Sequence, residues 1–293
     1  MALELSNAQR AEVLIQALPL IQKYYGKVVV VKYGGNAMIN DQLKEQVMED
    51  IVLLHLIGVK IVLVHGGGPE ITDTLKRLGK ESVFHNGLRV TDKETADVVQ
   101  MVLAGKINKS LVNLLETKGA DAIGLSGIDG HMIRAEMKDE ELGYVGKITK
   151  VDVKPITDIL EKGYIPVVST LGCDSEGNVY NINADTAAAY IAGAMGAWRL
   201  YTMTDIEGIL RDKNDHTSII PIIDLKEAEE LFRTGVISGG MIPKVECCID
   251  AINLGVKKVT IIDGRVPHAL LIETLTNEGA GTMVIRDKKN DKH

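Results

Sequence analysis

Two lysines, Lys32 and Lys244, each stand beside a pair of glycines in this chain of 293 residues. Lys32 follows four valines and precedes Gly34-Gly35, and Lys244 comes shortly after Gly239-Gly240. The valine run predicts a buried strand, and the glycines expose backbone N–H groups at its end. A cation beside such groups at the carboxyl end of a strand favours an anionic ligand, most simply a phosphate. The alternative is an exposed lysine beside a purely structural turn, since short glycine motifs also occur by chance.

A third glycine turn, Gly66-Gly67-Gly68, follows the apolar residues 61–64 and precedes Pro69. Proline at the first position of a helix leaves the free N–H groups and the positive helix end facing an anion. Glycine turns at consecutive strand ends are less easily explained as simple connections. We assign His65, which precedes the turn, a structural role because the sequence offers no triad partner for it.

Asn86-Gly87 predicts a β-hairpin within residues 82–92. The second arm of that hairpin returns Arg89, whose guanidinium can bind a carboxylate through two parallel hydrogen bonds. An arginine on the protein surface is the commoner alternative.

Asn181, Asn183 and Asp185 place three side-chain oxygens within five residues at a strand-to-helix junction. Asx residues before a helix are ordinary N-caps, so one interpretation is that Asp185 caps the helix. The other is that these oxygens orient a ligand or the lysines. Asp205 and Glu207 lie in a later turn that can border a nucleotide, although two such carboxylates could also bind a metal or be merely solvated.

Phosphoryl transfer to a carboxylate fits this set of residues. The chain contains no Gly-x-x-x-x-Gly-Lys-Ser/Thr motif, which excludes a Walker P-loop. An anionic acceptor needs no general base, so the absence of a convincing catalytic histidine is expected. Lysines, the N–H groups of Gly35 and Gly68, and nucleotide-bound Mg²⁺ would stabilise the charge on the nonbridging oxygens. In that mechanism Asp185 holds the lysines in place.

Two other functions remain open on the residues alone. A dinucleotide-binding oxidoreductase is disfavoured, because neither glycine loop reads Gly-x-Gly-x-x-Gly with an acidic residue about 20 positions later. A noncatalytic amino-acid sensor would bind its ligand without turnover, and the two lysines in glycine turns argue against it only in part.

Strands that alternate with helices must position these residues. The predicted strand segments are residues 28–31, 61–64, 122–125, 165–169, 199–203, 259–262 and 282–285. Crossovers of about a dozen residues or more predict a parallel sheet with both faces covered. We therefore expect an α/β fold, a three-layer αβα sandwich with an open, mainly parallel central sheet and two lobes that meet near residue 195. Residues 129–153 predict a small antiparallel annex, and Asp92 is expected to cap a long helix that ends near residue 117.

Composition excludes several classes of protein. With a net charge of −7 and 4% aromatic residues the chain has no basic face or stacking platform, so nucleic acid is not an expected partner. The apolar runs fall short of the ~18 residues of a membrane span, and the first residues show no signal-peptide pattern. Cys173, Cys247 and Cys248 form no Cys-x-x-Cys pair, which indicates a reducing compartment without a disulfide or zinc scaffold. We expect a cytoplasmic protein without a membrane partner.

An N-terminal helix over residues 7–25 precedes the first strand and extends the α/β core. Its apolar stripe contains Pro19, which is expected to kink or break the helix. The stripe either packs on its own domain or forms an interlocking contact between subunits.

Five segments, in order along nearly the whole chain, resemble motifs of the amino acid kinase family. They are Val31-Lys32-Tyr33-Gly34-Gly35, Val64-His65-Gly66-Gly67-Gly68-Pro69, Asn86-Gly87-Leu88-Arg89-Val90-Thr91-Asp92, Tyr180-Asn181-Ile182-Asn183-Ala184-Asp185 and Gly239-Gly240-Met241-Ile242-Pro243-Lys244-Val245. Within the family the chain is most similar to members that phosphorylate the γ-carboxylate of N-acetyl-L-glutamate in arginine biosynthesis. Carbamate, uridylate, glutamate and aspartate kinases are the nearest alternatives.

The resemblance implies roles for individual residues. Lys32 and Lys244 would stabilise the transferring phosphoryl group, with Asp185 organising both. Acceptor binding is assigned to Gly67, Gly68, Arg89, Asn181 and Asn183, with Arg89 on the α-carboxylate. ATP binding is assigned to Asp205, Gly208, Leu210, Ser238 and Lys244. Mg²⁺ is expected to arrive bound to ATP, with no metal held by the protein itself.

The resemblance also implies a quaternary and regulatory arrangement. Residues 1–26 form the kinked helical extension, 27–195 the acceptor-binding and dimerisation lobe, and 196–293 the ATP-binding lobe. The extension resembles that of arginine-inhibited hexamers, which are trimers of dimers with interlaced helices. Contacts with inhibitory L-arginine are expected at Tyr24, Glu278 and Gly281. Some relatives bind the nitrogen regulator PII, a partnership that one sequence does not reveal.

Overall fold

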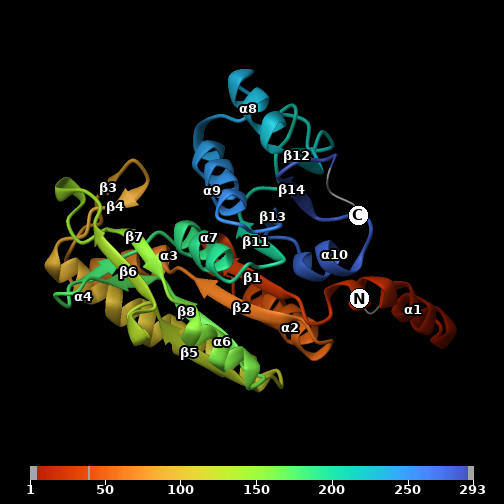
Figure 1. Ribbon diagram of the computed structural model, residues 1–293, viewed down its shortest axis with the longest axis horizontal. Helices are drawn as coiled ribbons and strands as arrows, with labels where there is room; N and C mark the ends of the chain where they lie inside the picture. Colours follow the sequence, from red (N-terminus) through yellow and green to blue (C-terminus); the bar gives the residue numbers. More distant parts are fainter. Residues whose placement is uncertain (1–4, 39, 290–293) are drawn as a thin grey trace.

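The computed structural model describes residues 5–38 and 40–289, so residues 1–4, 39 and 290–293 of the predicted lobes lie outside it. Helices and strands alternate along the chain (Figure 1). The helices are α1 (Asn7–Tyr24), α2 (Asp41–Leu56), α3 (Gly68–Arg77), α4 (Lys93–Gln100), α5 (Asn108–Thr117), α6 (Lys154–Glu161), α7 (Ala184–Ala194), α8 (Leu225–Arg233), α9 (Ile242–Asn253) and α10 (Ala269–Leu275). The strands are β1 (Val28–Tyr33), β2 (Lys60–His65), β3 (Phe84–His85), β4 (Leu88–Arg89), β5 (Ala122–Ser126), β6 (Ile133–Met137), β7 (Gly146–Val151), β8 (Ile165–Ser169), β9 (Leu171–Cys173), β10 (Val179–Asn181), β11 (Arg199–Thr204), β12 (Ile222–Asp224), β13 (Lys258–Asp263) and β14 (Gly281–Ile285).

Eight strands form the central sheet, in the order β12-β14-β13-β11-β1-β2-β8-β5. Neighbouring strands run parallel except for the antiparallel pair β13 and β14. The predicted α/β class with a mainly parallel sheet is therefore confirmed. The strands from the first part of the chain, β1, β2, β8 and β5, lie on one side, and those from the last part lie on the other. The two sets join where β1 pairs with β11.

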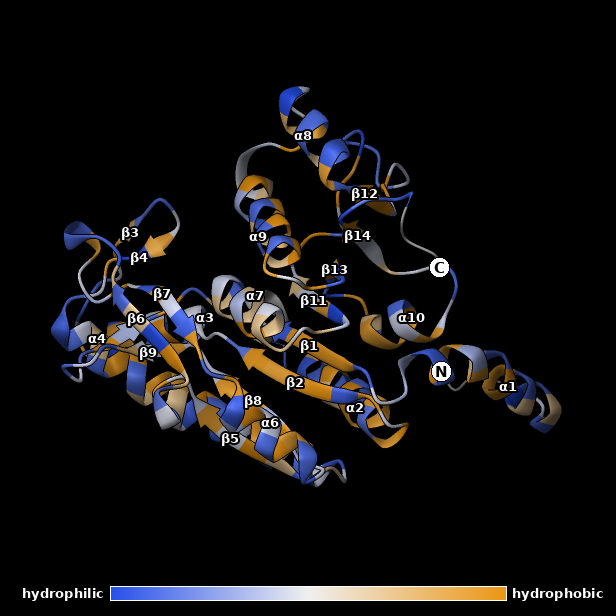
Figure 2. Cartoon of the chain, viewed as in Figure 1, coloured by the Kyte–Doolittle hydropathy of each residue, from blue (hydrophilic) through white to orange (hydrophobic). Residues whose placement is uncertain are grey.

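Both faces of the sheet are apolar and covered by helices, which gives the three predicted layers (Figures 1 and 2). Alternate residues of β1 show why: Val29 and Val31 pack into one core, and Val30 packs into the other. Side chains of α2, α3, α4, α5 and α10 fill the first core, and those of α6, α7, α8 and α9 fill the second. A strand buried on both faces needs a continuous apolar run, as the valines of β1 provide.

The position of β1 defines where a ligand can bind. The chain leaves β1 toward β2 on one side and later returns to β11 on its other side, so β1 marks a topological switch point. Ligands of open α/β sheets bind outside the carboxyl ends of the strands at such a point. Lys32 lies at this edge, in register with Val64 of β2 and Thr202 of β11.

Local predictions around the sheet are largely confirmed. Asn86 and Gly87 both have positive φ, 49° and 78°, and connect the hairpin strands β3 and β4, as a type I′ turn requires. The predicted antiparallel annex over residues 129–153 is confirmed for β6 and β7, but the observed sheet, β10-β9-β6-β7, also includes β9 and β10 from residues 171–181, and β6 pairs with β9 in parallel. Asp92 caps α4 by accepting a hydrogen bond from the Thr95 amide. The helix runs on to α5 through a π-helical stretch, Met101–Ile107, which the sequence did not predict.

The N-terminal helix α1 is continuous, so the expectation that Pro19 could break it is wrong. Proline removes one amide donor and disturbs one turn, and a capping box at Ser6 and Gln9 stabilises the start of this helix. The helix lies beside α10 and projects from one end of the molecule (Figure 1). Its apolar stripe faces solvent, with Leu14 71% exposed and Ile15 62% exposed. Among the described residues, no helix combines the length and apolarity needed to cross a bilayer.

Gly281 provides a test of close packing within the sheet. A Cβ atom added there would lie 1.8 Å from the carbonyl oxygen of Ile261, which belongs to the backbone and cannot move aside. We expect Gly281→Ala to lower the free energy of unfolding by ~1–3 kcal/mol, measured by urea denaturation. Gly105→Ala is the control, because its added Cβ has no atom within 4 Å. Equal losses in the two variants would contradict this account.

Candidate functional site

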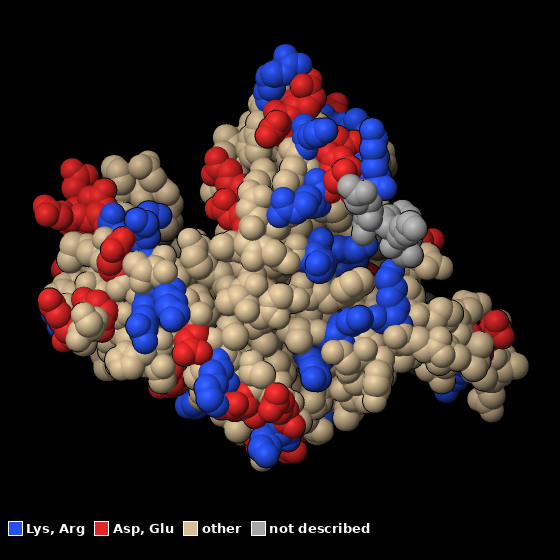
Figure 3. Space-filling model, viewed as in Figure 1, with Lys and Arg blue, Asp and Glu red and all other residues tan. Residues whose placement is uncertain are grey.

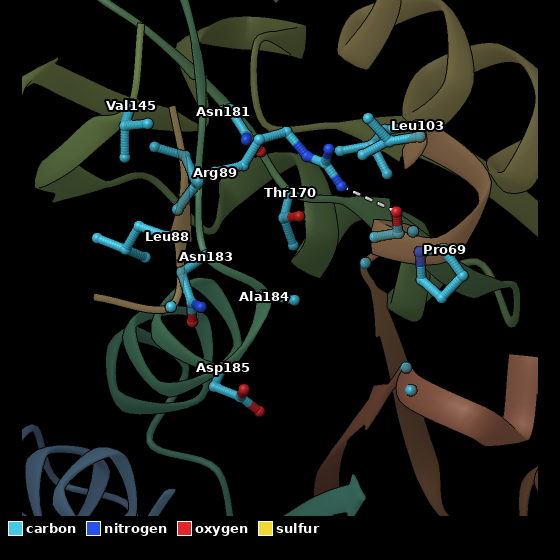
Figure 4. Close-up of a pocket in the computed structure, with 18 of the residues that line it drawn as sticks. Pro69, Leu88, Arg89, Leu103, Val145, Thr170, Asn181, Asn183, Ala184 and Asp185 are labelled. Carbon is cyan, nitrogen blue, oxygen red and sulfur yellow. Dashed lines mark hydrogen bonds between the residues drawn. The ribbon is translucent and has the colours of Figure 1, made fainter. Parts of the chain in front are cut away.

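A cavity of about 240 Å³ opens at the carboxyl ends of β1 and β2. Four segments line it: the turn after β1, the glycine turn that leads into α3, the β3–β4 hairpin, and the β10–α7 junction (Figure 4). Figure 3 shows the surface hollowed between the hairpin end of the molecule and the α8–α9 end, with charges of both signs interspersed on this face. Eight residues predicted to form the site line the cavity: Lys32, Gly35, Gly67, Gly68, Arg89, Asn181, Asn183 and Asp185.

The Lys32 ammonium is buried and paired. Its side chain is 10% exposed, and its Nζ lies 2.9 Å from Oδ1 of Asp185 in the first turn of α7. Asn183, rather than Asp185, caps this helix, by accepting a hydrogen bond of 3.0 Å from the Thr186 amide. The interpretation of Asp185 as the N-cap is therefore wrong. Because Asn183 already satisfies the helix end, the Asp185 carboxylate is available to the lysine.

Lys244 has a different carboxylate partner. Its ammonium, from the first turn of α9, contacts the Thr204 hydroxyl and lies 3.5 Å from Oδ1 of Asp205, at the carboxyl end of β11. Partial burial raises the pKa of Asp205, but its hydrogen bonds and the Lys244 charge outweigh burial and lower that pKa overall. Asp185 was expected to hold both lysines, but it pairs with Lys32 only. Lys244 lies on the other side of the switch point and pairs with Asp205.

Three hydrogen bonds to protein groups hold Arg89 in place. It is 6% exposed, and its Nη2 donates to the Gly68 carbonyl at 2.9 Å and to the Thr72 hydroxyl at 2.8 Å, while Nη1 donates to Ser82 (Figure 4 shows the bond to the Gly68 carbonyl). Burial lowers its pKa. These bonds occupy three of the five N–H groups of a guanidinium, which leaves the Nε–H group and one N–H group of Nη1 on different sides of the guanidinium.

Packing explains why position 67 is a glycine. The φ angle of Gly67 is extended, so backbone strain does not require a glycine there. A Cβ atom would instead lie 2.2 Å from Ile107 and 2.8 Å from Leu103, both in the π-helical stretch. The glycine turn is therefore pressed directly against that stretch. Asn181 lies across the cavity, and its amide donates to the Thr91 hydroxyl at 3.4 Å.

A second cavity, of about 330 Å³, lies beside the end of β11. Both apolar and charged side chains line it, a composition suited to a nucleobase with attached phosphates. Four of the residues assigned to ATP line it: Asp205, Gly208, Leu210 and Ser238. The fifth, Lys244, reaches the same edge through Asp205.

Arg265 also lines the second cavity, and sequence reasoning missed it. The buried carboxylate of Asp263, at the end of β13, accepts hydrogen bonds of 2.8 Å from its Nε and its Nη2. An Asp-Gly-Arg segment directly after a predicted strand was the available signal, because such a pair fixes a guanidinium at the sheet edge.

The three residues expected to bind arginine lie outside both cavities. Tyr24 is buried, and its hydroxyl lies 3.3 Å from that of Tyr201. Its ring stands 5.6 Å from the guanidinium of Arg199, which pairs with Glu273 at 3.0 Å. Glu273 in turn accepts a hydrogen bond of 2.7 Å from the Ala280 amide. The end of α1 is thereby connected to the segment that contains Glu278 and Gly281.

The chain belongs to the amino acid kinase family, whose model matches residues 27–263. It is therefore an enzyme, a phosphotransferase. Its curated relatives are acetylglutamate kinases. The protein from Brachyspira hyodysenteriae is 54% identical over 97% of this chain and 99% of its own length. The protein from Clostridioides difficile is 51% identical with the same coverage.

Solved structures share the fold. The smu.665 protein of Streptococcus mutans has a TM-score of 0.73 at 30% identity, covering 89% of this chain and 99% of that one. The N-acetylglutamate synthase of Neisseria gonorrhoeae, complexed with coenzyme A and N-acetyl-glutamate, has a TM-score of 0.82 at 23% identity. This chain is covered to 94% and spans 63% of the synthase chain, and the likeness shows the fold alone.

Lys32 and Arg89 should affect different kinetic constants. The role assigned to Lys32 is to stabilise the transferring phosphoryl group, so for Lys32→Ala we expect kcat to fall roughly 100-fold to 1,000-fold with smaller changes in KM. The role assigned to Arg89 is to bind the acceptor through charge-assisted hydrogen bonds, so for Arg89→Ala the KM of the acceptor should rise about 10-fold to 100-fold. Steady-state kinetics with each substrate varied measures both. Lys147→Ala, which breaks a surface pair with Glu136, should change neither constant. The reverse pattern would mean that the two roles are exchanged.

Proposed function

We propose that this chain transfers the γ-phosphoryl group of ATP to the γ-carboxylate of N-acetyl-L-glutamate, forming N-acetyl-L-glutamyl 5-phosphate and ADP in L-arginine biosynthesis. The observation that carries this proposal is the composition of the first cavity, in which a buried lysine and a fixed arginine line the same space. One cation suits the transferring phosphoryl group and the other a carboxylate of the acceptor. The kinship with acetylglutamate kinases over nearly the whole chain supports the same acceptor.

The acceptor would lie between the hairpin and the β10–α7 junction. The positive charge of Arg89 and one of its remaining N–H groups would bind its α-carboxylate. The side-chain amides of Asn181 and Asn183 offer donors and acceptors to the acetamido group. The amide N–H groups of Gly67 and Gly68 would donate hydrogen bonds to the carboxylate that is phosphorylated. An unacetylated amino acid would bring an ammonium group near two buried cations, which disfavours glutamate as the acceptor.

The nucleotide would occupy the second cavity, with its phosphates directed toward Lys244 and Lys32. Mg²⁺ bound to the phosphates would neutralise part of their charge. Within the part of the chain that the structure describes, no three His, Cys, Asp or Glu side chains are grouped to hold a metal ion. Asp185 and Asp205, which lie nearest the phosphate path, are engaged by the two lysines. This donor set fits an ion carried mainly by the nucleotide.

The proposed lobes follow the sheet. Residues 27–195 would bind the acceptor and form the dimer, and residues 196–293 would bind ATP. The three cysteines are free thiols, which supports the proposed cytoplasmic location.

Trapping the acyl phosphate tests the proposed function. In the presence of ATP, Mg²⁺ and hydroxylamine, we expect hydroxamate formation with N-acetyl-L-glutamate and at least roughly 100-fold lower kcat/KM with L-glutamate, because a lost or mismatched polar contact costs several kcal/mol. L-Aspartate and carbamate serve as further acceptors in the same assay. Equal or better turnover of glutamate would reject the acceptor, and no turnover of any acceptor would favour the amino-acid sensor.

We also propose a hexamer built as a trimer of dimers through α1, with L-arginine as feedback inhibitor bound near Tyr24, Glu278 and Gly281. The exposed apolar stripe of α1 supports a contact between subunits, because such a stripe is unfavourable in water. The chain of contacts from Tyr24 through Arg199 to Glu273 supports communication between α1 and the arginine segment.

A charge on the stripe of α1 tests this assembly. Leu14 is 71% exposed, so Leu14→Glu should leave the subunit folded while placing a charge inside the proposed interface. We expect the native mass to fall from hexamer to dimer and arginine inhibition to weaken, as measured by light scattering and by assay. Gln16→Glu adds the same charge beside the stripe and should change neither. An unchanged mass for Leu14→Glu would show that the stripe does not mediate assembly.

A further inference from the structure

His65 and Asn108 form a buried pair behind the glycine turn. Nδ1 of His65 lies 3.0 Å from the carbonyl oxygen of Gly66, and Nε2 lies 3.1 Å from the amide nitrogen of Asn108. The same nitrogen lies 3.1 Å and 2.8 Å from the carbonyl oxygens of Leu125 and Val167. Neither His65 nor Asn108 is among the residues that line the two cavities.

These contacts define one state of the imidazole. A carbonyl oxygen only accepts, so the contact with the Gly66 carbonyl needs a proton on Nδ1, and Nε2 of His65 is then an acceptor that shares the two N–H groups of the Asn108 amide with two carbonyl oxygens. The proton of the neutral ring is then on Nδ1, which donates to the Gly66 carbonyl. Burial lowers the pKa of His65 to about 4, so the ring stays neutral at physiological pH, as this arrangement requires.

The hydrogen bond from His65 to the Gly66 carbonyl also fixes the direction of the Gly67 N–H. The peptide bonds are trans, and in a trans peptide the C=O of one residue and the N–H of the next point in opposite directions. The N–H of Gly67 therefore points away from the imidazole. Among the described residues, no backbone carbonyl accepts a hydrogen bond from it, and Gly66 and Gly67 both line the first cavity.

Two local irregularities allow Asn108 to reach His65. Asn108 follows directly on the π-helical stretch Met101–Ile107, a type of turn that often marks functional sites. Gly124 leaves the space that Asn108 fills, because a Cβ atom there would lie 1.9 Å from Oδ1 of Asn108. That Oδ1 atom is buried without a partner among the described residues. A buried polar atom without a partner is unfavourable. The hydrogen bonds of the Asn108 nitrogen are therefore what explains an asparagine at this position.

We propose that His65 and Asn108 are positioning residues that aim the Gly67 N–H into the first cavity, where it donates to an oxygen of the acceptor or of the transferring phosphoryl group. This inference rests on the proposed function of the cavity. His65 sets the direction of the amide, and Asn108 sets the tautomer and the orientation of His65.

Two substitutions at His65 separate positioning from packing. His65→Asn keeps an amide nitrogen near the place of Nδ1, which can donate to the Gly66 carbonyl, whereas His65→Leu keeps the bulk and loses the donor. We expect kcat to fall about 100-fold in His65→Leu, the effect of misplacing one oxyanion donor, with both KM values within about 3-fold. His65→Asn should recover at least about 10-fold of that loss. Equal kcat values in the two variants would overturn the proposal.

Asn108→Leu and the double variant give an independent check. Asn108→Leu should lower kcat in the same direction, and adding it to His65→Leu should lower kcat little further, because both act through one hydrogen bond. Additive losses would overturn the proposal. Ser169→Ala is the structural control: Ser169 is buried, lies in register with His65 on β8 and donates to the Leu125 carbonyl, and its loss should lower the melting temperature without lowering kcat.

The readouts keep the two proposals apart. Wild-type turnover of N-acetyl-L-glutamate tests the proposed function, and the ratio of variant to wild-type kcat tests the positioning. That ratio is measured with whichever of the carboxylate acceptors the wild type uses best. Melting temperatures are recorded for every variant, so a loss of kcat that only tracks stability in both His65 variants counts against the proposal.

Discussion

The burial of the Lys32 ammonium is the constraint on which the site depends. A buried cation is costly unless a counterion and hydrogen bonds compensate, and Asp185 at 2.9 Å provides the counterion. That pairing needs β1 in the middle of the sheet and α7 with its first turn over the strand end. It also needs Asn183 to cap α7, which releases Asp185 for the lysine. Once these elements are in place, the glycine turns and the hairpin can close the cavity around one fixed charge.

A second pair of charges lies on the other side of the switch point. Lys244 and Asp205 are supplied by α9 and the end of β11, which belong to the later half of the sheet. A transferring phosphoryl group has to pass between an anionic donor and an anionic acceptor, so cations on both sides lower the repulsion along its whole route. Because Lys32 pairs with Asp185 and Lys244 pairs with Asp205, each lysine is positioned by a different carboxylate.

The opposite end of the sheet contains a comparable set of buried charges. Arg199 pairs with Glu273 beside the last turn of α1. His268, at the start of α10, lies 2.6 Å from the carboxylate of Asp50 in α2, and burial raises the pKa of Asp50 to about 6. The helix α10 has no side-chain cap of its own, so contacts from α2 tie it to the core. The element beside α1 is thereby joined firmly to the same sheet that carries the lysines.

Much of the fold and the positions of several site residues can be predicted from the sequence alone. The β-branched runs, the glycine turns, the Asn86-Gly87 hairpin and the Asp92 cap are determined by neighbouring residues, so local patterns predict them. The position of Lys32 could also be inferred, because parallel strands bring their carboxyl ends to one edge. Tertiary structure decided which carboxylate each lysine meets, that Arg265 reaches the second cavity, and that Asn108 holds His65. Those contacts join segments tens to hundreds of residues apart, and they depend on strand order, helix phase and a π-helical turn that no local pattern specifies.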